Sequence, residues 1–156
     1  MNDINTFFEA IQTGNISSIA SQLEQNSDLV NTKDARGFTP LIFATYFDKQ
    51  DIVEVLLANK APVDAKDASG NTALIGVSFK GNIALATLLI EQGADVNARN
   101  SIGVTPLIFA SMYNKVEMVD FLLKQNADQT IKDNDGKTAL HHANEKGFDA
   151  IIKLLE

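Results

Sequence analysis

Apolar residues recur along this chain at a fixed step of 33 positions, with glycines and threonines keeping the same step. One apolar series runs through Leu41, Leu74, Leu107 and Leu140. A later one runs through Leu56, Leu89, Leu122 and Leu155. In the stretch DIVEVLLAN, which starts at Asp51, Ile52 and Leu56 stand four apart, as do Val53 and Leu57. This spacing predicts a helix with one buried face. With a second helix earlier in each copy, the pattern predicts repeated helix pairs.

A turn and a cap signal precede the first helix of each copy. Asp34 and Gly37 occupy the first and fourth positions of a type I turn. Thr39 is then a natural N-cap, and Pro40 a natural first helical residue. The same signals recur at the Asp67, Asn100 and Asp133 turns. We therefore expect the first helices to begin after Thr39, Thr72, Thr105 and Thr138.

The second helix of each copy ends in a residue expected to adopt a left-handed backbone. Two copies place Gly93 and Asn126 there, the residue types that best tolerate this conformation. The remaining full copy has Lys60. Because a side chain at this position costs about 1 kcal/mol, Lys60 is predicted to be a weak point.

Helices of eight to ten residues are not stable alone in water, so each pair must pack on the next. The chain is therefore expected to form one domain, residues 1–156, arranged as a solenoid. Three full units span 34–66, 67–99 and 100–132. A C-terminal capping unit spans 133–156, and a more divergent N-terminal capping unit, with one extra residue before its turn, spans 1–33.

These units resemble ankyrin repeats. The family pattern combines a D-x-x-G turn, T-P-L-H, a polar break, I-V-x-L-L and G-A-D-V-N, and GADVNA occurs here from Gly93 to Ala98. The resemblance implies an all-α solenoid of helix-turn-helix units joined by β-hairpin-type loops. It also implies protein binding through the hairpin tips and the concave first-helix surface. The histidine of T-P-L-H is isoleucine in the full units and survives only as His141, which the resemblance makes a structural hydrogen-bonding residue.

Composition narrows the classes of partner. The net charge of −7 argues against nucleic acid and against anionic membranes, because both require clusters of Lys and Arg. The chain has no cysteine, which excludes disulfides and thiolate metal sites. Neither a secretory signal nor an apolar stretch of membrane-spanning length is recognisable. A cytoplasmic protein is expected.

Catalytic and metal-binding patterns are absent from the sequence. His141 and His142 are adjacent, so on a helix they point in different directions and make a poor metal pair. The segment DNDGK at Asp133 resembles the start of a calcium loop, but its glycine is misplaced and the twelfth position is Asn144 instead of glutamate. No phosphate-binding loop or nucleophile elbow occurs. The chain is predicted not to be an enzyme and to need no cofactor or metal.

The positions that vary between units are the candidate binding residues, because the framework requires no large apolar group there. On the hairpin tips and first helices they form an apolar and aromatic stripe with a basic rim, proposed to bind a partner: Arg36, Phe38, Tyr46, Phe47, Phe79, Lys80, Ile102, Val104, Met112 and Tyr113. Such a patch, if exposed, usually marks a protein-binding site. Phe47 and Tyr113 are the strongest candidates. Phe43 and Phe109 are predicted to belong to the core, and Glu145 and Lys146 to a solvated cap.

Three functions remain open from the sequence. The favoured one is a non-catalytic module that binds a partner protein of unknown identity. An inhibitor or immunity-type regulator that blocks an enzyme or toxin would use the same surface. A structural scaffold without a dedicated partner would instead pack the stripe between its units. A monomer or a weak homodimer is expected, because an apolar stripe can also pair with itself.

Overall fold

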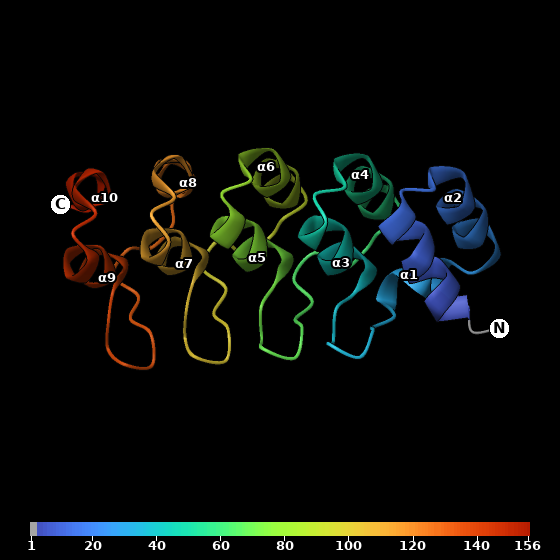
Figure 1. Ribbon diagram of the computed structural model, residues 1–156, viewed down its shortest axis with the longest axis horizontal. Helices are drawn as coiled ribbons and strands as arrows, with labels where there is room; N and C mark the ends of the chain where they lie inside the picture. The colour runs from blue at the N-terminus through green and yellow to red at the C-terminus, as the bar shows by residue number, and fades with distance from the viewer. Residues whose placement is uncertain (1–2) are drawn as a thin grey trace.

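The computed structural model describes residues 3–156, which form an elongated array of short helices with the two termini at opposite ends (Figure 1). No β-strand occurs in these residues. The helices are α1 (Asp3–Thr13), α2 (Ile16–Gln25), the 3-10 helix η1 (Ser27–Asn31), α3 (Pro40–Tyr46), α4 (Gln50–Ala58), α5 (Ala73–Lys80), α6 (Ile83–Glu91), α7 (Pro106–Met112), α8 (Val116–Lys124), α9 (Ala139–Lys146) and α10 (Asp149–Leu155).

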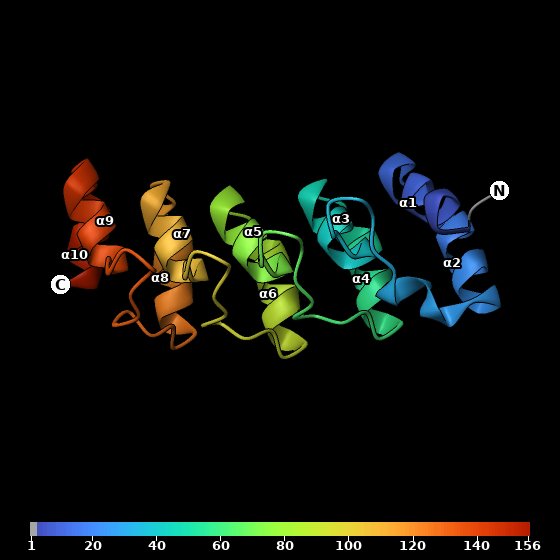
Figure 2. The same ribbon diagram turned by 90° about the horizontal axis from the view of Figure 1, so that it is seen from below.

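The helices form two layers. The odd-numbered helices lie in one row and the even-numbered helices in the other, and the loops before α3, α5, α7 and α9 project beyond the odd-numbered row (Figure 1). Seen from below, the pairs follow one another in chain order (Figure 2). Helix α5 contacts both α3 and α7, and α7 contacts α9. The fold is therefore an all-α solenoid, in which each unit packs on its neighbours.

Threonine side chains begin the first helices, as the sequence predicts. The hydroxyl oxygens of Thr39, Thr72, Thr105 and Thr138 each accept a hydrogen bond from the backbone N–H three residues later, at 3.2–3.3 Å. Three of these threonines are almost fully buried. Each cap satisfies a backbone donor that the helix cannot pair itself, which fixes where the first helix of the unit starts.

The loops between units are hairpin-shaped and stack on one another. In the first of them, Gly37 N–H donates to the Asp34 carbonyl and Asp34 N–H to the Phe38 carbonyl, each at 3.0 Å. Neighbouring loops are joined by backbone hydrogen bonds, such as that from Ala68 N–H to the Arg36 carbonyl at 3.1 Å. These contacts fix the positions of the loop tips relative to the helices.

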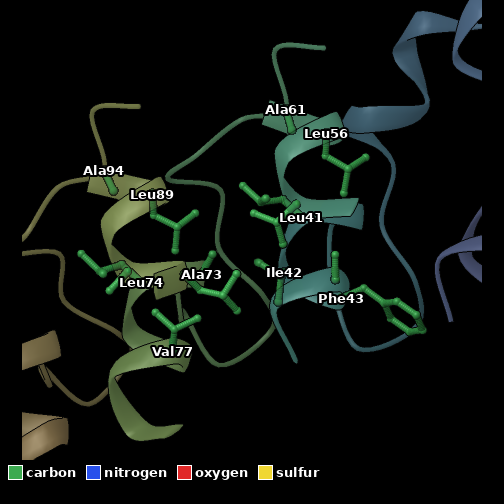
Figure 3. Close-up of a cluster of buried hydrophobic side chains, with 14 of the residues drawn as sticks. Leu41, Ile42, Phe43, Leu56, Ala61, Ala73, Leu74, Val77, Leu89 and Ala94 are labelled. Carbon is green, nitrogen blue, oxygen red and sulfur yellow. The ribbon is translucent and has the colours of Figure 1, made fainter. Parts of the chain in front are cut away.

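The core runs through the array between the two layers. Figure 3 shows Leu41 and Leu56 of one unit and Leu74 and Leu89 of the next within their own helix pairs, and all four are completely buried. The ring of Phe43 points away from the third unit, toward the N-terminal one (Figure 3), where it meets Phe8 at a centroid distance of 5.1 Å. A side chain in this register position therefore fills the space between its own unit and the preceding one.

Lys60 adopts the left-handed conformation that the sequence predicts, with φ of +64°. We expect Lys60→Gly to raise the free energy of unfolding by about 1 kcal/mol, because glycine carries no penalty there. Urea denaturation followed by circular dichroism would measure the gain. Lys60→Ala removes the same charge but keeps a Cβ, so it should leave stability nearly unchanged. An equal gain in both variants would contradict the backbone explanation.

Candidate functional site

A groove of about 590 Å³ opens between α3 and α5, on the face formed by the first helices and the hairpin loops. We call it the Gly76 groove. Its lining residues are Phe38, Ile42, Thr45, Tyr46, Asp67, Asn71, Thr72, Ala73, Gly76, Phe79, Lys80, Phe109 and Tyr113. Two other hollows, one on α9 and one across α6, α8 and α10, are more open to solvent. The groove is therefore the best-enclosed concave site among these three.

Two aromatic clusters flank the groove. The α3 cluster consists of Phe8, Phe38, Phe43, Tyr46 and Phe47, whose neighbouring rings lie 4.8–5.7 Å apart. The α5–α7 cluster consists of Phe79, Phe109 and Tyr113, with centroid distances of 4.6–5.4 Å. Aromatic contacts at these distances are stabilising. The clusters therefore give the groove apolar walls held in place by ring contacts.

The gap between the clusters is due to a missing side chain. Gly76 occupies the register position held by Phe43, Phe109 and His142 in the other units. Since this position fills the space toward the preceding unit, a glycine leaves that space open between α3 and α5. A Cβ built on Gly76 would meet no other atom within 4 Å. The groove thus exists because one unit lacks the ring that its neighbours carry.

Charged groups at the rim are already paired within the chain. Lys80 donates hydrogen bonds to the Tyr46 carbonyl and to Asp48 Oδ2, the latter at 2.7 Å. Burial alone would raise the pKa of Asp48, but hydrogen bonds from Lys80 and Asn82 outweigh it and hold the pKa below its ordinary value. Arg36 pairs with Asp34 at 2.9 Å while its guanidinium lies 4.2 Å from the Phe38 ring centroid.

Five of the ten candidate residues line the groove: Phe38, Tyr46, Phe79, Lys80 and Tyr113. Tyr46, Phe79 and Tyr113 are exposed, at 54%, 40% and 45% of their surface. Arg36 lies beside the groove on Phe38. Phe47 is half-buried and packs on Phe43 and Tyr46. The role of these candidate residues in binding a partner stays a prediction.

The other three candidates lie outside the groove. Ile102 is the most exposed large apolar residue of its loop, at 61%, and Met112 is half-buried. Val104 does not meet the condition of exposure on which it was a candidate, because only 1% of its surface reaches solvent. Its N–H is held by the Asn100 side chain at 2.9 Å, and its side chain joins the core. At this variable position of the hairpin tip, the side chain of Val104 therefore points into the core.

Phe109 also differs from expectation, whereas Lys146 is exposed as predicted. Phe43 is buried as predicted, but Phe109 is only half-buried, packs on Phe79 and forms part of a groove wall. Lys146 is exposed, yet its Nζ donates to the Met112 carbonyl at 3.0 Å and lies 5.4 Å from the Tyr113 ring centroid. The cap is thus solvated and also contacts the preceding unit.

Sequence reasoning also missed Gly76 and Asp67. The signal for Gly76 was present, since aligning the units at their 33-residue step puts a glycine where the neighbours carry rings. From the sequence, Asp67 is identified only as a turn residue. Its difference from Asp34 and Asp133 lies in the side chains that surround it, namely a serine at 69 where Arg36 stands, and Gly76 where His142 stands.

The structural histidine is His142 and not His141, contrary to expectation. His142 is buried, and its Nε2 lies 2.8 Å from Asp133 Oδ2. His141 is exposed and lies 3.5 Å from Glu145. The inner units bury Ile42, Ile75 and Ile108 in the register position of His141. Among the described residues α9 packs on α7 and α10, and His141 is exposed on its open side.

The contact between His142 and Asp133 makes stability depend on pH. Burial alone would raise the pKa of Asp133, but hydrogen bonds from His142, Lys137 and Asp135 outweigh it and hold the pKa below its ordinary value. A lowered folded-state pKa stabilises the fold at pH values above the unfolded-state pKa, and this contribution is lost as the pH falls through the folded value.

We therefore expect Asp133→Asn to flatten the acid limb of the stability curve below about pH 4, since this variant has no carboxylate to protonate. Thermal unfolding between pH 2.5 and 6 would measure it. The turn itself tolerates asparagine, because Asn100 fills the same position in the preceding unit. Parallel curves for the variant and the parent would contradict the assignment.

Within residues 3–156, no group of three or more His, Cys, Asp or Glu side chains is placed to hold a metal ion. The same residues contain no helix whose length and apolar character would let it cross a membrane. The geometry described above is thus that of a concave apolar surface with paired charges at its rim.

Comparison with known proteins places the repeated units in a family. A family model for ankyrin repeats, three copies in length, matches residues 7–100 and again residues 75–156. The two matches overlap and together cover nearly all of the chain. The search of curated proteins found no match to this chain.

Proposed function

Because this chain belongs to the ankyrin-repeat family, whose members generally mediate protein–protein interaction and are generally non-catalytic, we propose that it binds a partner protein through the Gly76 groove. The hairpin tips beside the groove would add contacts, with Ile102 as their exposed apolar residue. Affinity would come from the aromatic walls, and specificity from the polar groups of the rim.

The observation that carries this proposal is the exposure of Tyr46, Phe79 and Tyr113 around one concave site. Tyrosine and phenylalanine are enriched in the cores of protein interfaces, where they bury large areas with little loss of conformational freedom. A scaffold without a partner would gain stability by burying these rings between its units. Their exposure beside an unfilled groove favours a binding surface over a purely structural array.

The test compares capture from a lysate by three immobilised baits: the parent protein, Tyr46→Arg with Tyr113→Arg, and a control pair. Gln25→Arg with Gln92→Arg adds the same two charges on exposed positions at the ends of second-layer helices. We expect a partner that is retained by the parent and the control bait and lost with the tyrosine variant. Circular dichroism would verify that all baits are folded. Equal retention by all three would contradict binding at the groove.

A further inference from the structure

Asp67 supplies the turn carboxylate that faces the groove, and only one of its two oxygens accepts hydrogen bonds from the described residues. Asp67 Oδ1 accepts hydrogen bonds from the N–H groups of Ser69 and Asn71, at 2.8 and 2.9 Å, and these hold the turn. Among residues 3–156, none donates a hydrogen bond to the other oxygen, Oδ2. Asp67 nevertheless lines the groove and is partly buried. One carboxylate oxygen at the groove is thus left for a donor from outside the chain.

The equivalent groups in the other units have partners within the chain. Asp34 Oδ2 accepts two hydrogen bonds from the Arg36 guanidinium, at 2.9 and 3.2 Å. Asp133 Oδ2 lies 2.8 Å from the ring of His142. The unit of residues 100–132 has no charge to balance, because Asn100 stands there and donates to the Asn71 side chain. Asp67 is therefore the one turn carboxylate in this series without a basic side chain on Oδ2.

The walls around this carboxylate suit a flat cation. Arg36 shows the chemistry within the same molecule, because its guanidinium binds Asp34 while lying 4.2 Å from the Phe38 ring centroid and 5.4 Å from that of Phe43. A guanidinium is planar, stacks on aromatic faces and donates two parallel hydrogen bonds to a carboxylate. The groove offers the same combination, with Asp67 beside the aromatic walls. Lys80 does not neutralise Asp67, since its ammonium is held by Asp48 and the Tyr46 carbonyl.

We infer that the Gly76 groove binds an arginine side chain presented by the partner protein, with the guanidinium paired to Asp67 and its faces against the aromatic walls. This inference rests on the proposed function and specifies the chemistry of the partner. The net charge of −7 favours approach of a basic segment. The absent ring at Gly76 makes room for the arginine, which takes the place that the His142 ring has beside Asp133.

The test uses three blocked peptides, acetyl-Ala-Leu-Xaa-Leu-Ala-amide, in which Xaa is arginine, citrulline or norleucine. Each is titrated into the ¹⁵N-labelled protein, and the affinity is read from amide chemical shifts. We expect the arginine peptide to shift the amides between Asp67 and Gly76 and to bind at least about tenfold more tightly than the citrulline peptide, because the charged hydrogen bonds are lost with citrulline. Equal binding of the norleucine peptide, or no binding of the arginine peptide, would overturn the inference.

Two variants test the site from the protein side. Asp67→Asn keeps the acceptor that the turn needs, as Asn100 does in the next unit, and removes the charge. It should weaken binding of the arginine peptide about tenfold or more and leave the norleucine peptide unaffected. Gly76→His should fill the groove and bind Asp67 as His142 binds Asp133, so peptide binding should be lost while the fold gains stability. Unchanged binding of the arginine peptide to either variant would contradict the site.

Failure of this inference is distinguishable from failure of the proposed function. A partner lost with the Tyr46→Arg, Tyr113→Arg bait but retained by Asp67→Asn would leave the groove as the binding site and exclude arginine as its ligand. A partner lost with both baits would support both proposals. Retention of every captured protein by both baits would contradict both.

Discussion

Replacing Leu74 by alanine is expected to lower the free energy of unfolding by about 2–5 kcal/mol, the usual cost of truncating a fully buried leucine. Leu74 is completely buried, with units packed on both sides of its own. In a solenoid each unit is stabilised by its two neighbours, so the cavity weakens the middle of the array. Urea denaturation of parent and variant would give the difference.

Leu140 provides the matched control for Leu74. It occupies the same position in the last unit but is only half-buried, because no further unit covers it. Leu140→Ala should therefore cost about 1 kcal/mol, in proportion to the smaller apolar area that it buries. Equal losses for the two variants would mean that position in the array does not matter, contrary to a fold stabilised by neighbouring units.

Replacing Gly70 by alanine is expected to cost about 2–4 kcal/mol, from a left-handed backbone penalty and a steric clash. Gly70 has φ of +78°, which disfavours any residue with a Cβ. An added Cβ would lie 2.7 Å from the Ser101 backbone nitrogen. That nitrogen donates to the Ser69 carbonyl at 3.1 Å, so the clash would also disturb the hydrogen bond between neighbouring loops.

Gly136 separates these two contributions. It has the same φ of +78°, but a Cβ there would meet nothing within 4 Å. Gly136→Ala should thus show only the backbone penalty of about 1–2 kcal/mol. The difference between the two variants, measured by thermal unfolding, is the cost of the clash. A Gly136→Ala loss as large as that of Gly70→Ala would place the whole effect in the backbone.

The fold could be predicted from the sequence because its determinants are local and repeated. The caps at Thr39, Thr72 and Thr105 depend on residues only three positions away, and the left-handed residue at Lys60 follows from its place in the register. Such signals can be identified in the sequence without knowledge of the tertiary structure. Their recurrence at one step also fixed how successive units must pack.

The site was less predictable, because exposure depends on what the neighbouring unit supplies. Phe43 is buried against Phe8 of the preceding unit, whereas Phe109 packs on Phe79 of its own preceding unit and stays half-buried. The buried histidine that contacts the turn carboxylate is His142 and not His141. Each of these outcomes requires comparing two units at once. Comparing the residues that stand at the same position in each unit reveals the gap at Gly76, but it does not reveal the inward orientation of Val104.

The missing ring at Gly76 is also expected to decide where the middle of the array divides when it begins to unfold. Because the side chain that would fill the space toward α3 is absent, we expect the boundary before residue 67 to be weaker than the boundaries between α5 and α7 and between α7 and α9. Partial unfolding should separate the chain there into two cooperative segments. A partner side chain bound in the groove would contact both α3 and α5 and would therefore link the two segments. Binding would therefore slow amide exchange in both segments, well beyond the residues that the ligand touches.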